Sequence, residues 1–163
     1  MSEKVIPGRH TAAAEGDIVV FHIGLRINRL RAVSSWLPAF MSMPRMLREL
    51  SREEGSGLLG YKVLYGGPRD FYVVQYWSDK ERLLAYAHQQ DREHRPAWAA
   101  FNRRARAGKG QVGIWHETFI VPAGSYESVY VDMPAYGLAA ATGVVPVGRR
   151  GDTAAQRLRA AER

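Results

Sequence analysis

The chain has 163 residues, of which 46% are hydrophobic, and a net charge of +7, which fits one globular domain and excludes a disordered chain. Because it has no cysteine, disulfides, thiolate zinc sites and thiol nucleophiles are excluded. No apolar run reaches the roughly 18 residues of a membrane span and no apolar stretch begins the chain, so we expect a cytoplasmic protein without a membrane partner. Two groups of basic residues lie far apart in the sequence, one on or after a helix at residues 92–109 and one in the C-terminal segment, and a nucleic-acid partner is therefore not expected.

Residues 17–29 predict the first strand, after an N-terminal arm. One face of this strand is apolar throughout and carries Val19, Phe21, Ile23, Leu25 and Ile27. The alternate positions include His22, Arg26 and Asn28, which need water, a pocket or a partner. We expect the apolar face to pack against helices.

Residues 34–53 predict a helix, because their large apolar side chains recur at helical spacing. Ser34 or Ser35 is expected to cap its start, and Pro44 predicts a kink or a break inside it. Gly55, Ser56 and Gly57 end this element.

Residues 58–77 predict two strands joined by a glycine-rich turn at residues 66–70. Ser78 and Glu81 then have the spacing of a capping box, which predicts the start of a second helix. This helix is expected to break near residues 91–95 and to resume afterwards.

A fourth strand is predicted at residues 111–121, so the order is strand, helix, strand, strand, helix, strand. This order is that of the ferredoxin-like split βαβ fold of the α+β class, in which both helices cover one face of an antiparallel sheet. The bare face needs a partner, and a second copy packed against it would close a dimeric α+β barrel around an internal space. We therefore expect a homodimer.

Residues 123–143 extend the domain beyond this unit. Tyr126 and Tyr130 lie on one face of a predicted fifth strand, which a proline- and glycine-rich loop follows. A single domain is expected to cover residues 1–147, and the polar, basic residues 148–163 are expected to form a flexible or weakly helical tail.

Common catalytic signatures, among them the nucleophile elbow, the Walker loop and the dinucleotide fingerprint, are missing from the sequence. The densest group of functional residue types is on the second helix, where His94, Trp98 and Phe101 would share a face beside Asn102. His94 is a candidate haem ligand, proton shuttle or hydrogen-bonding partner of a substrate. A surface histidine at a helix break explains it equally well.

Two strand histidines form a second candidate site. His22 and His116 are expected to face the barrel interior together, with Arg26 as a stabiliser of an anion or enolate, while Trp115 faces the other layer. Satisfied polar residues at a dimer seam are the alternative, and that alternative is slightly favoured. Several strand tyrosines are candidates for holding an aromatic ligand: Tyr61, Tyr65, Tyr76 and Tyr130.

The segment VVQYWSDKERLLAYAHQQDREHRPAWAAFNR resembles the third strand and second helix of the antibiotic-biosynthesis monooxygenases, which are dimeric α+β barrel proteins. With GDIVVFHIGLRINR, MPRML and VGIWHETF, the chain is more similar to a monooxygenase-like branch that includes a polyketide-tailoring protein of fumagillin biosynthesis. The resemblance covers roughly residues 8–147. It implies a homodimer that oxidises a small electron-rich or polyketide-like molecule.

The resemblance also implies two kinds of chemistry. Some relatives need no cofactor, because the substrate is deprotonated to a carbanion that reacts directly with dioxygen. Others bind haem b through a histidine of the second helix, and His94 best fits that place. Arg95 and Pro96 directly after it depart from the pattern of the haem-degrading members.

The leading hypothesis is therefore a cofactor-free monooxygenase of secondary metabolism, with a small-molecule substrate and dioxygen as its partners. A histidine is the expected general base, because proton abstraction near neutral pH suits imidazole. The pocket hypothesis comprises the possible bases His94, His22 and His116 and the substrate-binding residues Arg26, Trp98, Phe101, Asn102, Tyr61 and Tyr76. The alternatives are a haem-dependent oxidoreductase or aldoxime-dehydratase-like enzyme with His94 as axial ligand, and a ligand-binding barrel without catalysis.

Overall fold

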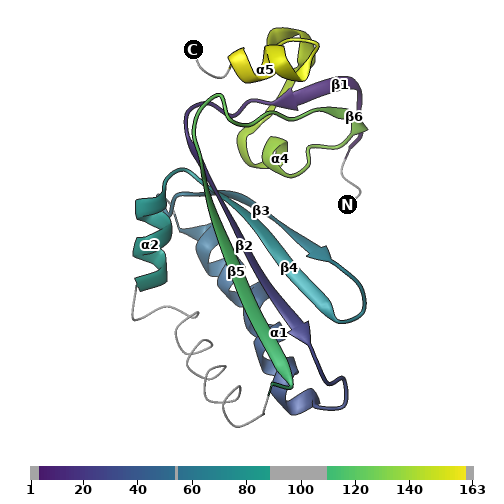
Figure 1. Ribbon diagram of the computed structural model, residues 1–163, viewed down its shortest axis with the longest axis vertical. Coiled ribbons are helices and arrows are strands. Elements are labelled where there is room, and N and C mark those ends of the chain that lie inside the picture. The colour runs from purple at the N-terminus through teal and green to yellow at the C-terminus, as the bar shows by residue number, and fades with distance from the viewer. Residues whose placement is uncertain (1–3, 54, 89–109, 161–163) are drawn as a thin grey trace.

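The structure, a computed structural model, describes residues 4–53, 55–88 and 110–160 (Figure 1). Its larger sheet has four antiparallel strands in the order β3-β4-β2-β5. This order is the ferredoxin-like one, so the predicted α+β class and fold are confirmed. The strands of this sheet are β2 (Ile18–Ile27), β3 (Leu58–Tyr65), β4 (Asp70–Trp77) and β5 (Val112–Val121).

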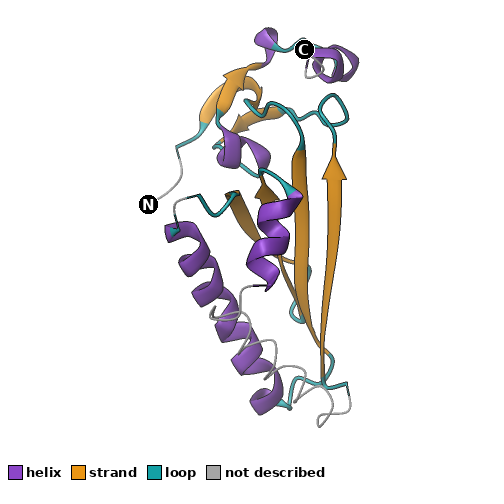
Figure 2. Cartoon of the chain, turned by 90° about the vertical axis from the view of Figure 1, so that its left-hand side faces the viewer, coloured by secondary structure: helices purple, strands orange, loops and turns teal. Residues whose placement is uncertain are grey.

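Helices α1 (Val33–Arg52) and α2 (Lys80–His88) lie on one side of this sheet (Figure 1, Figure 2). The side chains that fix them there form one buried cluster, in which Val19 of β2 and Trp77 of β4 pack with Leu50 of α1 and Leu83 of α2. Trp77 has no solvent exposure. The apolar alternation of the first predicted strand therefore does pack against helices, as expected. We call this side of the sheet the helix face and the opposite side the far face.

The start of α1 differs from the prediction. Ala32 precedes the helix and no side chain caps it, because the Ser35 hydroxyl instead donates to Gln111 Oε1 at 2.8 Å. Pro44 lies inside the helix without ending it. The turns that follow Pro44 bury Leu47 and Leu50, to 4% and 2% exposure, and this packing offsets the hydrogen bond that proline removes.

The start of α2 also differs, because Asp79 rather than Ser78 caps it. The backbone N–H of Arg82 donates to Asp79 Oδ1 at 2.8 Å, and the Ser78 hydroxyl donates to Asp79 Oδ2 at 2.7 Å. These two hydrogen bonds, the backbone one first, lower the pKa of the Asp79 carboxyl. A carboxylate cap also interacts favourably with the positive end of the helix dipole.

A second, three-stranded sheet lies at one end of the first (Figure 1). Its antiparallel order is β6-β1-β7, so the N-terminal arm is a strand whose pairing partners lie at least 120 residues away. The predicted fifth strand is shorter than expected and begins at Tyr130. The strands are β1 (Ile6–Ala12), β6 (Tyr130–Met133) and β7 (Val144–Pro146), and helix α4 (Leu138–Thr142) lies between the last two.

This C-terminal extension covers one end of the far face. Helix α4 packs so closely on β3 that a Cβ at Gly60 would lie 2.8 Å from Ala141 Cβ and 2.9 Å from Ala141 Cα. Leu138 and Ala139 join Ile18 in a buried cluster at the same end. The far face is therefore only partly uncovered in the chain, whereas the order of the elements predicted a wholly bare face.

The segment after β7 is also folded where the structure describes it. It forms the short helices η1 (Val147–Arg149) and α5 (Ala154–Ala160). Arg157 is only 6% exposed and donates from Nε to Glu127 Oε2 at 2.8 Å. This arginine thus attaches α5 to the extension, and the flexible or weakly helical character of the tail stays a prediction.

Candidate functional site

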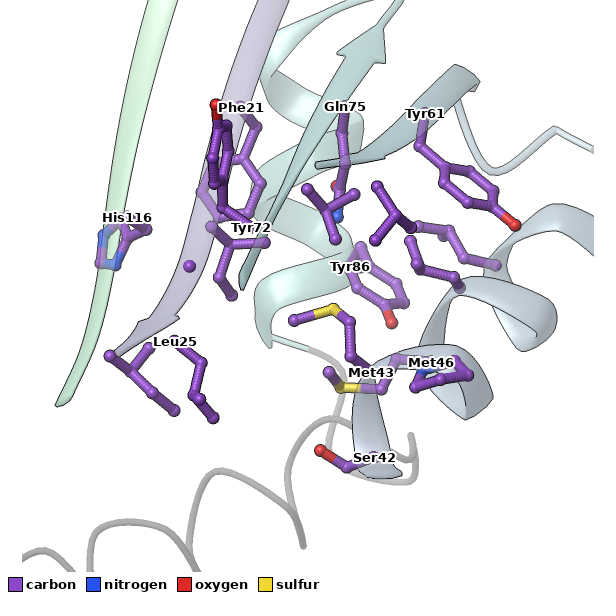
Figure 3. A pocket seen from close by; sticks show the side chains of 18 of the residues that line it. Phe21, Leu25, Ser42, Met43, Met46, Tyr61, Tyr72, Gln75, Tyr86 and His116 are labelled. Carbon is purple, nitrogen blue, oxygen red and sulfur yellow. The ribbon is translucent and has the colours of Figure 1, made fainter. Parts of the chain in front are cut away.

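A cavity of about 1020 Å³ lies between the helix face and helices α1 and α2 (Figure 3). Its walls are mainly aliphatic and aromatic, and Met43 and Met46 of α1 lie across it from Phe21 and Leu25 of β2. A cavity of this size with few polar groups has the usual character of a site for a small organic molecule. The position is unexpected, because the sequence placed the pocket on the polar face of the sheet.

Several strand residues that line the cavity carry polar side-chain atoms, and four of them lie in two adjacent rows of the sheet. The strand register aligns Tyr61, Gln75, Phe21 and Thr118 in one row across β3, β4, β2 and β5, and His116 lies in the next row beside Ile23. All of them line the cavity. The floor therefore offers a phenol, an amide, a hydroxyl and an imidazole within an otherwise apolar surface.

The charged groups at this cavity are all basic in the described part of the chain. Arg48 and Arg52 of α1 and Lys80 of α2 line it, and no carboxylate among the described residues does. Such a site favours neutral or anionic ligands over cations.

His116 is an exposed residue of β5 at the margin of the cavity, where its ring lies 5.8 Å from the ring of Phe21. The strand register pairs it with Ile23, which places its imidazole on the helix face, and Figure 3 shows it at one edge of the lining side chains. No hydrogen bond to a described residue holds the ring. The imidazole can therefore exchange a proton with a molecule in the cavity.

His22 lies on the far face, so the expectation that it shares a face with His116 is wrong. The strands pair His22 with Glu117 and Ile23 with His116, and residues paired across strands point to the same side. His22 Nδ1 is 3.9 Å from Glu117 Oε2, and its ring packs edge-on against Phe119. His22 does not line the cavity.

Arg26 is on the far face as well and cannot hold an anion in this cavity. Its guanidinium Nη1 donates to both carboxylate oxygens of the cross-strand neighbour Asp70, at 2.8 and 2.7 Å. The positive charge of Arg26, which the sequence analysis expected to bind an anionic ligand, is therefore paired with the Asp70 carboxylate.

Two of the tyrosines predicted to bind the substrate also lie on opposite faces of the sheet. Tyr61 lines the cavity, and Tyr76 lies on the far face among the residues of the extension. Burial raises the pKa of the Tyr76 phenol, and the neighbouring Tyr130 and Tyr136 add to this shift. Tyr76 is therefore a packing residue beneath α4 rather than a pocket residue.

The helix residues of the candidate site are His94, Trp98, Phe101 and Asn102. They lie outside the residues that the structure describes. Their roles stay predictions, and so does haem ligation by His94. Within the described ranges, no group of three histidine or acidic side chains is placed to hold a metal ion. No helix in these ranges is both long and apolar enough to cross a membrane.

Sequence reasoning missed Gln75, which at 6% exposure is the most deeply buried polar side chain among the described residues that line the cavity. The signal was present as a single amide in the strand DFYVVQYW, where its neighbours Val74 and Tyr76 face the other way. An isolated amide on the apolar face of a central strand requires a partner.

With this geometry in place, comparison with known proteins assigns the family. Residues 18–138 match the model of the Monooxygenase af470-like family. The chain belongs to this family. It is similar to Monooxygenase af470 of Aspergillus fumigatus, at 31% identity over 150 residues that cover 85% of this chain and 50% of that protein. The chain spans about half the length of this family relative, and the resemblance inferred from its motifs is confirmed.

Solved structures with a similar fold are more distant from this family member. SnoaB, a cofactor-independent oxygenase from Streptomyces nogalater, matches at 15% identity and a TM-score of 0.40, covering 63% of this chain and 91% of its own. A possible oxidoreductase of unknown function from Bacteroides thetaiotaomicron matches at 16% identity and a TM-score of 0.42, covering 66% and 99%. Likenesses of this degree carry no statement about activity.

Proposed function

We propose that the chain is a small-molecule monooxygenase of secondary metabolism, which oxidises an electron-rich, polyketide-like substrate in the cavity between the sheet and the helices. The observation that carries the proposal is this cavity, with its apolar and aromatic walls and a histidine at its margin, in a member of a monooxygenase family. A flat aromatic ketone or phenol matches such walls, because it buries apolar area and presents only a few oxygens.

The proposed reaction needs no cofactor. A base, for which His116 is the described candidate, takes a proton from a CH₂ group that is conjugated with a carbonyl through an aromatic ring, and the charge of the carbanion moves through the ring onto that carbonyl oxygen as an enolate. The carbanion carbon bonds to dioxygen, and protonation gives a hydroperoxide. Loss of water then leaves a new C=O, so the substrate loses four electrons and dioxygen supplies one oxygen atom to the product and one to water.

The first test follows the oxygen atoms with dithranol, a phenolic tricyclic ketone with an activated CH₂, as the probe. We expect protein purified without added metal or haem to consume one dioxygen per quinone formed, and isotopically labelled dioxygen to place one labelled atom in the product, as mass spectrometry measures. Dithranol also oxidises spontaneously, so the rate is compared with heat-denatured protein. Binding of dithranol without faster oxidation would favour the ligand-binding alternative over the monooxygenase.

We also infer that the chain works as a homodimer through the uncovered part of the far face. Trp115 and Phe119 of β5 are 37% and 47% exposed there. The Trp115 ring lies over Gly24, where any Cβ would collide with it, so a flat apolar surface continues from β5 onto β2. Exposed aromatic side chains on a sheet face are typical of protein interfaces.

The dimer is tested by measuring the solution mass with light scattering during size-exclusion chromatography. We expect the wild-type chain to elute at twice the monomer mass and Trp115→Glu to elute as a monomer, because the carboxylate would be buried without a partner. Met41→Glu on α1 is the matched control, since Met41 is 52% exposed outside the far face, and it should remain dimeric. A monomeric wild type would contradict the proposal.

A further inference from the structure

Gln75 combines deep burial with a fixed orientation. It lies on β4, a central strand of the sheet, and is 6% exposed on the helix face. Two residues along the strand, on the same face, Trp77 donates from its indole Nε1 to Gln75 Oε1 at 3.0 Å. The indole N–H only donates, so the Gln75 carbonyl oxygen must face it and the amide NH₂ must point elsewhere.

The NH₂ group points into the cavity. Figure 3 shows the end of the Gln75 side chain directed into the space between the strands and Tyr86 of α2. No hydrogen-bond acceptor for this nitrogen is found among the described residues. A buried N–H without an acceptor is destabilising, and native proteins rarely keep one without a use.

The surroundings define what the amide can bind. Gln75 lies between Phe21 and Tyr61 in its row of the sheet, so the acceptor must belong to a molecule that is otherwise apolar. The charged groups that line the cavity in the described ranges are basic. They favour an oxygen that carries negative charge over one on a cationic ligand.

We propose that Gln75 is a substrate-binding residue that donates its amide N–H to the carbonyl, enolate or phenolate oxygen of a planar aromatic substrate. Trp77 is a positioning residue, because it acts by holding the Gln75 carbonyl. The inference rests on the proposed function, in which charge develops on this oxygen when the substrate is deprotonated. A preorganised donor in a dry site stabilises such an oxygen more than water does.

The positions of Gln75, Phe21 and Tyr61 also constrain where the substrate can carry its acceptor oxygen. Strands are spaced about 4.8 Å apart, so an aromatic body resting on the Phe21 ring can place an edge oxygen at the neighbouring Gln75 amide. His116 lies one strand beyond Phe21 and one row further along. The acceptor oxygen and the carbon that loses its proton are therefore expected on opposite sides of a fused ring system.

The test measures binding without turnover, using β-naphthol and naphthalene as probes that differ by one hydroxyl. Fluorescence titration of the purified full chain should show that Gln75→Glu and Gln75→Met each bind β-naphthol roughly tenfold more weakly, the effect of one lost hydrogen bond. Affinity for naphthalene should change by less than about threefold. Gln75→Glu keeps an acceptor for the Trp77 indole and replaces the amide donor by a carboxylate, whereas Gln75→Met removes the donor without adding a charge. Circular dichroism checks that each variant is folded.

Two more variants complete the series. Trp77→Phe keeps an aromatic ring in the core but frees the amide to rotate, and should reduce the preference for β-naphthol by a smaller factor than Gln75→Glu. Gln156→Glu on α5, an exposed site far from the cavity, makes the same chemical change and should leave both affinities at the wild-type values.

Equal losses for both probes in the Gln75 variants, or a wild type with no preference for β-naphthol, would overturn the inference. Its failure is distinct from that of the proposed function. If the preference depends on Gln75 while dithranol is never oxidised, the recognition role stands and the monooxygenase proposal falls. If dithranol is oxidised and Gln75→Glu alters neither β-naphthol binding nor the rate, only the role of Gln75 falls.

Discussion

His116→Ala is expected to slow the oxidation of dithranol by about 100- to 10,000-fold, the usual contribution of a general base. The physical reason is that the described walls of the cavity offer no carboxylate and no second histidine to take the proton. Binding should be much less affected, because the imidazole is exposed at the margin rather than buried beneath the ligand. Oxygen consumption under saturating substrate measures the rate, and fluorescence titration measures the affinity.

His22→Ala is the matched control for this prediction. The two histidines lie on adjacent strands and on opposite faces of one sheet, so His22→Ala should retain the wild-type rate within about twofold once its solution mass is shown to be unchanged. Added imidazole should partly restore His116→Ala, which loss of folding would not allow. A His116→Ala enzyme with full activity would remove this residue as the base and leave His94 as the remaining candidate.

Arg157→Met is expected to destabilise the C-terminal extension by about 2–4 kcal/mol. Arg157 is nearly buried and donates to Glu127 and to the carbonyl oxygens of Gly151 and Asp152, at 2.8–3.1 Å. Removing one partner of a buried ion pair costs about 3–5 kcal/mol, and partial solvent exposure of Glu127 lowers that figure. Methionine keeps much of the packing and removes the charge.

Hydrogen exchange followed by mass spectrometry is the measurement for this prediction, because a terminal segment can open without global unfolding. We expect faster exchange in peptides that contain α5 and Glu127, and unchanged exchange in β4. Arg159→Met is the control, since Arg159 is exposed on the same helix and should behave as wild type. Equal exchange in the two variants would mean that the Arg157 pair does not hold the extension in place.

The sequence by itself determined the larger sheet and its helices. A strand with period-two alternation such as residues 17–29 has one apolar face, which must be buried, and the order of elements leaves the ferredoxin-like arrangement as the way to bury it. The sequence predicted the capping residues at the helix ends less well. Asp79 competed with Ser78 for the cap of α2, and an ionised carboxylate is the stronger acceptor for a backbone N–H.

Only the tertiary structure decided which face holds the site. The polar side chains of the first strand suggested a pocket beside His22 and Arg26. In the structure these two residues instead have Glu117 and Asp70 as their neighbours on the adjacent strands, on the same face of the sheet. Cross-strand register depends on pairing between distant segments, and a shift of one residue exchanges the faces. The observed register places His116 on the helix face.

The small second sheet and the orientation of Gln75 could not be predicted from the sequence either, because both depend on contacts between segments that are distant in the chain or on tertiary packing. Strand β1 has no neighbour near it in the chain, and its pairing partners lie at least 120 residues later. The Gln75 amide points into the cavity because a Trp77 indole, itself fixed by packing from both helices, holds its carbonyl. Composition and alternation specify the local elements and their buried faces, whereas long-range register and packing decide which polar groups meet in the cavity.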